Sequence, residues 1–230
     1  MTASSASSAS AVLFQDVPVA GVKLALQRAV PRQLGRKQAL FHEGEPAAAL
    51  YLIQSGRLKL TQLSPDGQEV LVRFVGPGEI CAGVAALQGS SYPVTAQAVE
   101  TVRLLLWPRE VLRELCDRYP QMQTNILRTI TGHLQESMTR TRELATEKVP
   151  QRVARTLLRL ADQAGRQVDG GVLVDHPLSR QELAEMAGTT LYTVSRLIAR
   201  WEADGIVEAG RQRVTIRSRQ RLAELAEEGD

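Results

Sequence analysis

The 230-residue chain has only two cysteines and no long hydrophobic run. Cys81 and Cys116 are too few for a disulfide framework or for paired CxxC metal ligands. No apolar stretch approaches the ~20 residues that cross a bilayer, which excludes a membrane-spanning helix. Residues 1–11 are rich in Ser and Ala and lack the basic and apolar regions of a secretory signal. We therefore expect a cytoplasmic protein with reduced thiols and no membrane partner.

A large excess of one charge is also missing. The chain carries 28 Lys and Arg against 25 Asp and Glu, a net charge of +3, which by itself does not indicate a nucleic-acid partner. The distribution says more, because residues 211–221 hold five arginines and no acid. The acidic residues collect at the C-terminus instead: Glu224, Glu227, Glu228 and Asp230. The placement of charge, and not its total, indicates a nucleic-acid surface in the second half of the chain.

The chain exceeds the usual length of one domain, and its pattern of apolar, polar and turn-forming residues changes along the sequence. Short helical pieces are expected over residues 13–30, broken at Pro18 and Pro31. Alternating stretches between glycine-containing turns predict an antiparallel sheet over 38–107, with a hairpin at Asp66-Gly67. We predict an α+β protein with the following segments: a disordered tail 1–12, an antiparallel β domain 13–119, a long helix 120–148, a C-terminal domain 149–222 and an acidic tail 223–230.

The segment 121–145 predicts one long helix of about 37 Å at ~1.5 Å per residue. Its apolar residues recur at three- and four-residue spacing and form a stripe on one face. Two such helices packed in a dimer would bury the stripe, and covering the chain's own sheet would bury it equally well. The stripe comprises Met122, Ile126, Leu127, Ile130, Leu134, Met138 and Leu144, of which Ile126, Ile130, Leu134 and Met138 are the expected dimer contacts.

The C-terminal third predicts two short helices separated by a glycine turn and followed by a hairpin. After a helix over 151–164 and a strand over 172–174, Ser179 and Glu182 form a capping box that starts a helix. This helix should end at Gly188, and Thr189 or Thr190 should cap a second helix that ends near residue 203. The alternating residues 211–216 predict a small hairpin after it. These are the dimensions of a helix-turn-helix with a wing.

The second of these helices separates into two faces. Its core face comprises Val194, Leu197, Ile198 and Trp201, and its opposite face comprises Tyr192, Arg196, Ala199 and Arg200. Arg196 can pair with O6 and N7 of a guanine, whereas hydroxyl groups reach bases or phosphates. The expected DNA contacts are Ser179, Arg180, Gln181, Thr190, Tyr192, Thr193, Ser195, Arg196, Arg200 and Arg211.

Several segments resemble one known family, in the family's order. They are residues 178–188 (LSRQELAEMAG), 192–196 (YTVSR) and 201–207 (WEADGIV) in the helix-turn-helix, and residues 40–46 (LFHEGEP), 50–56 (LYLIQSG) and 76–79 (GPGE) upstream. The chain resembles the catabolite activator and fumarate-nitrate regulator superfamily, CRP/FNR. The resemblance implies a β-roll sensor domain, a homodimer held by the long helix, a near-palindromic double-stranded DNA operator and contact with RNA polymerase.

The chain also departs from that family at its effector residues. Cyclic-AMP-binding members carry a Glu for the ribose and an Arg for the cyclic phosphate, and residues 81–87 and 92–96 contain neither. A buried phosphate without its cation carries a large penalty, so cyclic AMP is not expected. Two cysteines cannot hold a [4Fe–4S] cluster. Residues 92–100 resemble the gas-responsive branches, some of which bind haem, for which Cys81, His42, His133 and His176 are the candidate ligands. The effector pocket is placed at Gly78, Glu79, Cys81, Gly83, Val94 and Thr95.

A further departure lies on the recognition helix. The resemblance places Tyr192 where the best-known members carry a Glu that accepts from cytosine or adenine, and Leu191 precedes it. The half-site should therefore differ, while Arg196 keeps its guanine.

Three functions stay open at this point. The favoured one is a dimeric DNA-binding transcription regulator, activator or repressor, that answers to an effector or a redox or gas signal. The others are a haem- or thiol-based sensor that acts through a protein partner, and a constitutive regulator without an effector. No nucleophile elbow, phosphate loop or metal-ligand cluster indicates an enzyme.

Overall fold

The computed structural model describes residues 12–67, 69–174, 178–210 and 213–227. The chain divides into two compact units, Met1–Glu136 and Ser137–Asp230, and the long helix α5 (Pro120–Thr146) contributes to both. The expected tail 1–12 falls almost wholly outside the described residues, and Val12 opens the short helix η1 (Val12–Phe14). Helix α2 (Val19–Arg28) follows directly after Pro18, as the sequence predicts.

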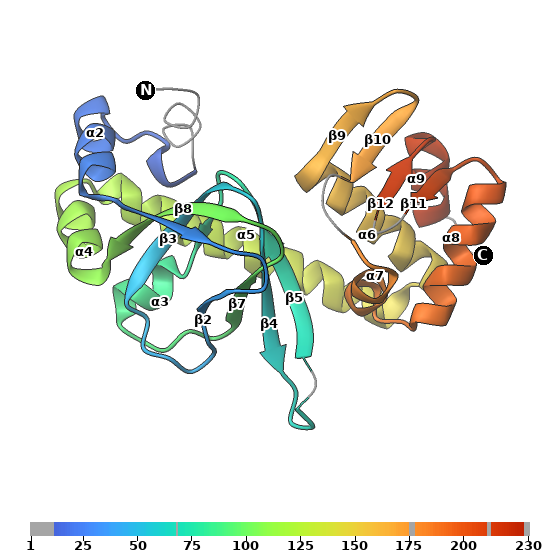
Figure 1. Cartoon of the computed structure of the whole chain (residues 1–230), viewed down its shortest axis with the longest axis horizontal. Helices are drawn as coiled ribbons and strands as arrows, with labels where there is room; N and C mark the ends of the chain where they lie inside the picture. Colours follow the sequence, from blue (N-terminus) through green and yellow to red (C-terminus); the bar gives the residue numbers. More distant parts are fainter. Residues whose placement is uncertain (1–11, 68, 175–177, 211–212, 228–230) are drawn as a thin grey trace. The chain divides into compact units, whose positions relative to one another are not determined.

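The first unit is built on two four-stranded sheets whose paired strands are all antiparallel (Figure 1). One sheet has the order β1-β8-β3-β6 and the other the order β2-β7-β4-β5. Their strands are β1 (Val30–Leu34), β2 (Ala39–Phe41), β3 (Ala49–Ser55), β4 (Leu58–Leu63), β5 (Glu69–Val75), β6 (Ile80–Cys81), β7 (Thr95–Ala98) and β8 (Val102–Pro108). The predicted hairpin joins β4 and β5, with Gly67 at φ +75° in its turn. The predicted antiparallel sheet is confirmed.

Strand β3 is buried on both faces because it separates two hydrophobic cores. Leu50 and Leu52 pack with the helices of the unit, whereas Tyr51 and Ile53 face the space between the two sheets. This alternation follows from the two-residue period of a strand. The helical side includes α4 (Arg109–Arg118) and the start of α5. Trp107 at the end of β8 is fully buried there, and its Nε1 donates to the carbonyl of Ala25 at 2.7 Å.

The apolar stripe of α5 divides between two environments. Met122 and Ile126 are buried in the helical core of their own chain, Ile126 with 1% exposure. The expectation that Ile126 is a dimer contact is therefore wrong in this structure, because its side chain packs against Gly83 of helix α3 (Gly83–Gln88). The remaining stripe residues are large, apolar and half exposed: Leu127, Ile130, Leu134, Met138 and Leu144. The start of the stripe therefore covers the core of its own chain, and burial of the exposed part in a dimer stays a prediction.

The second unit contains the helix-turn-helix and its wing. Its elements after α5 are α6 (Val149–Ala164), β9 (Gly165–Val168), β10 (Gly171–Val174), α7 (Arg180–Ala187), α8 (Leu191–Ala203), β11 (Val207–Gly210), β12 (Arg213–Ile216) and α9 (Arg219–Glu227). Strand β9 was not predicted, since its polar residues GRQV carry no alternation, and it forms by pairing with β10. Residues 223–227 of the expected acidic tail instead belong to α9, where Leu222 and Ala226 are buried, and residues 228–230 lie outside the described residues.

Candidate nucleic-acid interface and effector cavity

The helix caps predicted for the helix-turn-helix form in the structure. The Ser179 Oγ accepts from the Glu182 amide at 3.1 Å, and a Glu182 carboxylate oxygen accepts from the Ser179 amide at 2.8 Å. Helix α7 ends at Gly188, which adopts φ +61°, and the Thr190 Oγ1 accepts from the Thr193 amide at 3.3 Å to cap α8. The hydroxyls of Ser179 and Thr190, both expected near DNA, therefore set the two helix starts.

Helix α8 has one buried face and one exposed face. Val194, Ile198 and Trp201 are buried, whereas Leu197, expected with them, is only partly buried. The opposite face exposes Tyr192, Ala199 and the two arginines Arg196 and Arg200. Neither arginine side chain forms a hydrogen bond or ion pair with any residue that the structure describes. Their guanidinium groups are free to contact bases or phosphates.

Several other side chains predicted to contact DNA are hydrogen-bonded within the chain or partly buried. The Arg180 Nη1 donates to the Ser195 carbonyl at 3.2 Å and so ties α7 to α8. The Gln181 amide donates to Glu185 at 2.9 Å. Thr193 and Ser195 are partly buried on α8, and Arg211 lies outside the described residues.

The basic wing is less basic than the sequence indicated. Arg217 pairs with Glu208, Arg219 with Asp162 at 2.7 Å, and Arg221 donates to the carbonyl of Asp204 at 2.7 Å. These three arginines of the segment 211–221 therefore stabilise the second unit itself. The basic surface expected from the five arginines is therefore reduced, because the acids Glu208 and Asp162 pair with Arg217 and Arg219, and a backbone carbonyl accepts from Arg221.

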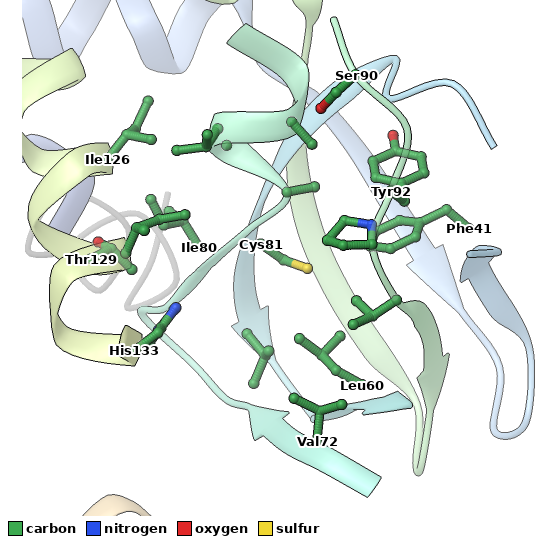
Figure 2. Close-up of a pocket in the computed structure, with 18 of the residues that line it drawn as sticks. Phe41, Leu60, Val72, Ile80, Cys81, Ser90, Tyr92, Ile126, Thr129 and His133 are labelled. Carbon is green, nitrogen blue, oxygen red and sulfur yellow. The ribbon is translucent and has the colours of Figure 1, made fainter. Parts of the chain in front are cut away.

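The first unit contains a cavity of about 380 Å³ between its sheets and α5. Its wall is mostly apolar, and Figure 2 shows Cys81 between the α5 residues on one side and the Phe41–Tyr92 pair on the other. These two rings stack with centroids 3.8 Å apart. The Tyr92 hydroxyl is already hydrogen-bonded within the chain, since it accepts from the Ala48 amide at 3.0 Å and lies 3.1 Å from the Tyr51 hydroxyl. The volume is in the range of small-molecule sites.

Three of the six predicted pocket residues line this cavity: Cys81, Gly83 and Val94. Gly78, Glu79 and Thr95 do not. Glu79 instead accepts hydrogen bonds from the Gly76 amide at 2.6 Å and from Arg73, and the Thr95 hydroxyl accepts from the Glu43 amide at 3.0 Å. Both side chains are used to hold the loops of the β-roll.

Charged and polar groups meet at the α5 side of the cavity. Arg73 of β5 bonds to Glu79 and donates to Nε2 of His133 on α5. Because arginine can only donate, Nε2 must accept and His133 is neutral, with its proton on Nδ1. Burial, and then the neighbouring Arg73 charge, lower the pKa of His133 to about 4. The Thr129 hydroxyl donates to the Asn125 carbonyl at 3.0 Å.

Known proteins match the chain over almost all of its length. Residues 31–119 match the family "Cyclic nucleotide-binding domain", and residues 151–225 match the "Crp-like helix-turn-helix domain". A cyclic AMP receptor protein of Thermus thermophilus is 31% identical over 214 residues, which cover 93% of this chain and 96% of that protein. The chain belongs to the CRP/FNR family.

Two further relatives agree with this assignment. A CRP-like cAMP-activated global transcriptional regulator of Mycobacterium tuberculosis is 29% identical over 218 residues, 95% of this chain and 97% of that protein. The solved structure of FixK2 from Bradyrhizobium japonicum has a TM-score of 0.76 and 25% identity, covering 88% of this chain and 99% of that one. This CRP/FNR protein is thus a DNA-binding transcription regulator and not an enzyme. No helix in the described ranges has the length and apolar content to cross a bilayer.

The cavity of this CRP/FNR chain does not fit a cyclic nucleotide. Among the described lining residues the only guanidinium or ammonium group is that of Arg73, which is already bonded to Glu79 and His133. A cyclic phosphate would therefore enter an apolar wall without a free cation. The prediction that cyclic AMP is not the ligand is consistent with this donor set.

The same residues do not fit haem. A cysteine ligates iron as the thiolate, and burial raises the pKa of Cys81 to about 12. The lone pair of His133 Nε2 is occupied by Arg73, His42 is exposed outside the cavity, and His176 lies outside the described residues. In the part of the chain that the structure describes, no three His, Cys, Asp or Glu side chains gather as metal ligands.

Sequence reasoning missed Arg73 and Arg152. Arg73 interrupts the otherwise apolar run 70–75, and a charge in a buried strand was the available signal. Arg152 donates to the carbonyls of Glu147, Ala187 and Gly188 at 2.6, 2.9 and 3.1 Å. It thereby satisfies the C-terminal carbonyls of α7 and orients the helix-turn-helix, which no local pattern indicates.

Proposed function

We propose that this chain is a homodimeric regulator that binds a near-palindromic double-stranded DNA operator and responds to an effector other than cyclic AMP. The observation that carries the proposal is the exposed face of α8. There Arg196 and Arg200 have no partner among the described residues, whereas Arg217 and Arg219 are paired within the chain. Arg196 pairs with a guanine in each half-site, and Arg200 contacts phosphate.

The dimer rests on the exposed part of the α5 stripe. Leu127, Ile130, Leu134 and Met138 follow each other at three- and four-residue spacing and are 45–65% exposed. Such a row of large apolar side chains is the seam that two parallel helices bury. A two-fold dimer then presents two copies of α8 to a two-fold symmetric operator.

The effector is a largely apolar molecule without net charge. The cavity of about 380 Å³ offers apolar walls, and Arg73 is already matched by Glu79. The relatives whose names refer to cyclic AMP therefore do not define the ligand of this chain. Ile126, Ile130 and His133 bring α5 into the cavity wall, so an occupant changes the helix that carries the proposed seam. The output passes to RNA polymerase, as activation or repression.

Sequence selection from a random DNA pool tests DNA recognition, and light scattering of the full chain tests the dimer. We expect enrichment of one two-fold symmetric motif and a mass of twice 25.2 kDa. Leu134→Arg should give monomers, whereas Thr139→Arg, at an exposed position outside the apolar row, should not. No symmetric motif, or an equally dimeric Leu134→Arg, would contradict the proposal.

The cavity is tested with N-phenyl-1-naphthylamine, an uncharged apolar fluorophore, against cyclic AMP. We expect the fluorophore to bind with enhanced emission and cyclic AMP not to displace it. Val94→Trp fills the cavity and should abolish binding, whereas Val70→Trp, at an exposed position of β5 outside the cavity, should not. Displacement by cyclic AMP would overturn the effector class. If neither ligand binds, the β-roll is a constitutive scaffold.

A further inference from the structure

Helix α8 begins with two large apolar side chains in solvent. Tyr192 is 86% exposed and Leu191 is 41% exposed, at the first two positions of the helix. No hydrogen bond or ring contact joins either side chain to another described residue. The other large apolar residues of α8 are buried or partly buried. Tyr192 therefore contributes little to the packing of its own unit, and Leu191 presents a large part of its side chain to solvent.

Their position relates them to Arg196. At 100° per residue, Leu191, Tyr192, Ser195 and Arg196 fall within an arc of about 140° on the helix surface. Tyr192 and Arg196 are one turn apart, so they are neighbours on the exposed face. An α-helix in the major groove contacts base edges mainly with its N-terminal residues. Leu191 and Tyr192 are therefore placed where a base next to the guanine of Arg196 can be contacted.

The chemistry of this first turn selects one base. Helix α8 carries one acid, Glu202, at its far end, where the carboxylate accepts from the Ala209 amide at 3.0 Å. The first turn thus has no carboxylate to accept from the amino group of cytosine. In the major groove the apolar feature of a base pair is the 5-methyl group of thymine. The Leu191 side chain and the Tyr192 ring offer an apolar surface that matches this group, and neither carries a carboxylate for the amino group of cytosine.

We infer that Leu191 and Tyr192 are specificity-determining residues that recognise the 5-methyl group of a thymine next to the guanine bound by Arg196. The inference rests on the DNA recognition proposed above. It assigns the recognition helix one charged contact for guanine and one apolar contact for thymine.

Deoxyuridine in place of that thymine tests the inference, because uracil lacks only the methyl group. The probe is the operator selected with the full-length protein, with uracil placed at this position in one half-site. Burial of one methyl group is worth ~0.8 kcal/mol, so we expect about a fourfold loss of affinity. Leu191→Ala/Tyr192→Ala should bind the thymine and uracil operators equally. Tyr192→Phe keeps the ring and should retain the fourfold difference.

The outcomes separate the two hypotheses. If no symmetric motif is enriched, DNA recognition as proposed fails. If a motif is enriched but lacks a thymine beside the guanine, or binds equally well with uracil, recognition stands and the role of Leu191 and Tyr192 is overturned. Uracil at a thymine between the half-sites is the control and should leave the affinity unchanged. Thermal unfolding should be near that of the parent, since both side chains are exposed.

Discussion

Arg159 of α6 holds Glu143 of α5, with its Nη1 2.7 Å from both carboxylate oxygens. The Glu143 side chain is only 5% exposed, whereas that of Arg159 is 31% exposed. A buried carboxylate requires its cation, so this pair connects the last turns of α5 to the helix-turn-helix unit.

Replacing Glu143→Gln should lower the free energy of unfolding of the second unit by about 2–3 kcal/mol. The substitution leaves Arg159 without its acid, although the exposed part of its guanidinium recovers some hydration. Denaturant unfolding followed by circular dichroism measures the loss. Asp162→Asn is the matched control, because its pair with Arg219 is exposed on both sides and should change stability by less than about 0.5 kcal/mol.

Gly188→Ala should destabilise the second unit more than Gly205→Ala. Both glycines have positive φ, +61° and +67°, where a Cβ costs about 1–2 kcal/mol. A Cβ at Gly188 would also lie 2.3 Å from Cδ2 of Leu144, whereas one at Gly205 meets open space. The difference between the two melting temperatures isolates the steric contribution, and equal losses would show that Leu144 moves aside freely.

Acidification should weaken the first unit through His133. Its pKa is about 4 in the folded chain because of burial and Arg73, against an ordinary 6.5. The unfolded chain therefore binds more protons between these values, and the free energy of unfolding falls as the pH drops from about 6.5 to 4. His133→Gln should flatten this pH dependence. His42→Gln, at an exposed position, is the control, and an unchanged profile in His133→Gln would contradict the assignment.

Replacing Arg196→Ala should cost ~1–3 kcal/mol of operator affinity and relax selection at one base pair. Its guanidinium has no partner among the described residues, so the change removes a DNA contact and little else. Fluorescence anisotropy with the selected operator and with single-base variants measures both effects. Arg219→Ala is the matched control, since Arg219 bonds to Asp162. Equal losses in the two variants would refute a base-specific role for Arg196.

Interactions between near neighbours in the sequence could be predicted. The Ser179–Glu182 capping box, the end of α7 at Gly188 and the cap at Thr190 span three to four residues each, and all form as expected. The hairpin at Gly67 belongs to the same class. The spacing of apolar residues also predicted the two faces of α8, because helical geometry alone decides which residues share a face.

The sequence by itself therefore determined the two helices of the helix-turn-helix, the β4–β5 hairpin and the exposed face of α8. Only the tertiary structure decided which of these side chains are buried and which charges are paired. Ile126 and Leu134 share one periodic stripe, yet the first is buried against Gly83 and the second is exposed. Arg219 and Arg196 look alike in sequence, but Asp162, 57 residues away, neutralises only the first. Burial and charge pairing depend on residues brought together by folding, and no local pattern encodes those distances.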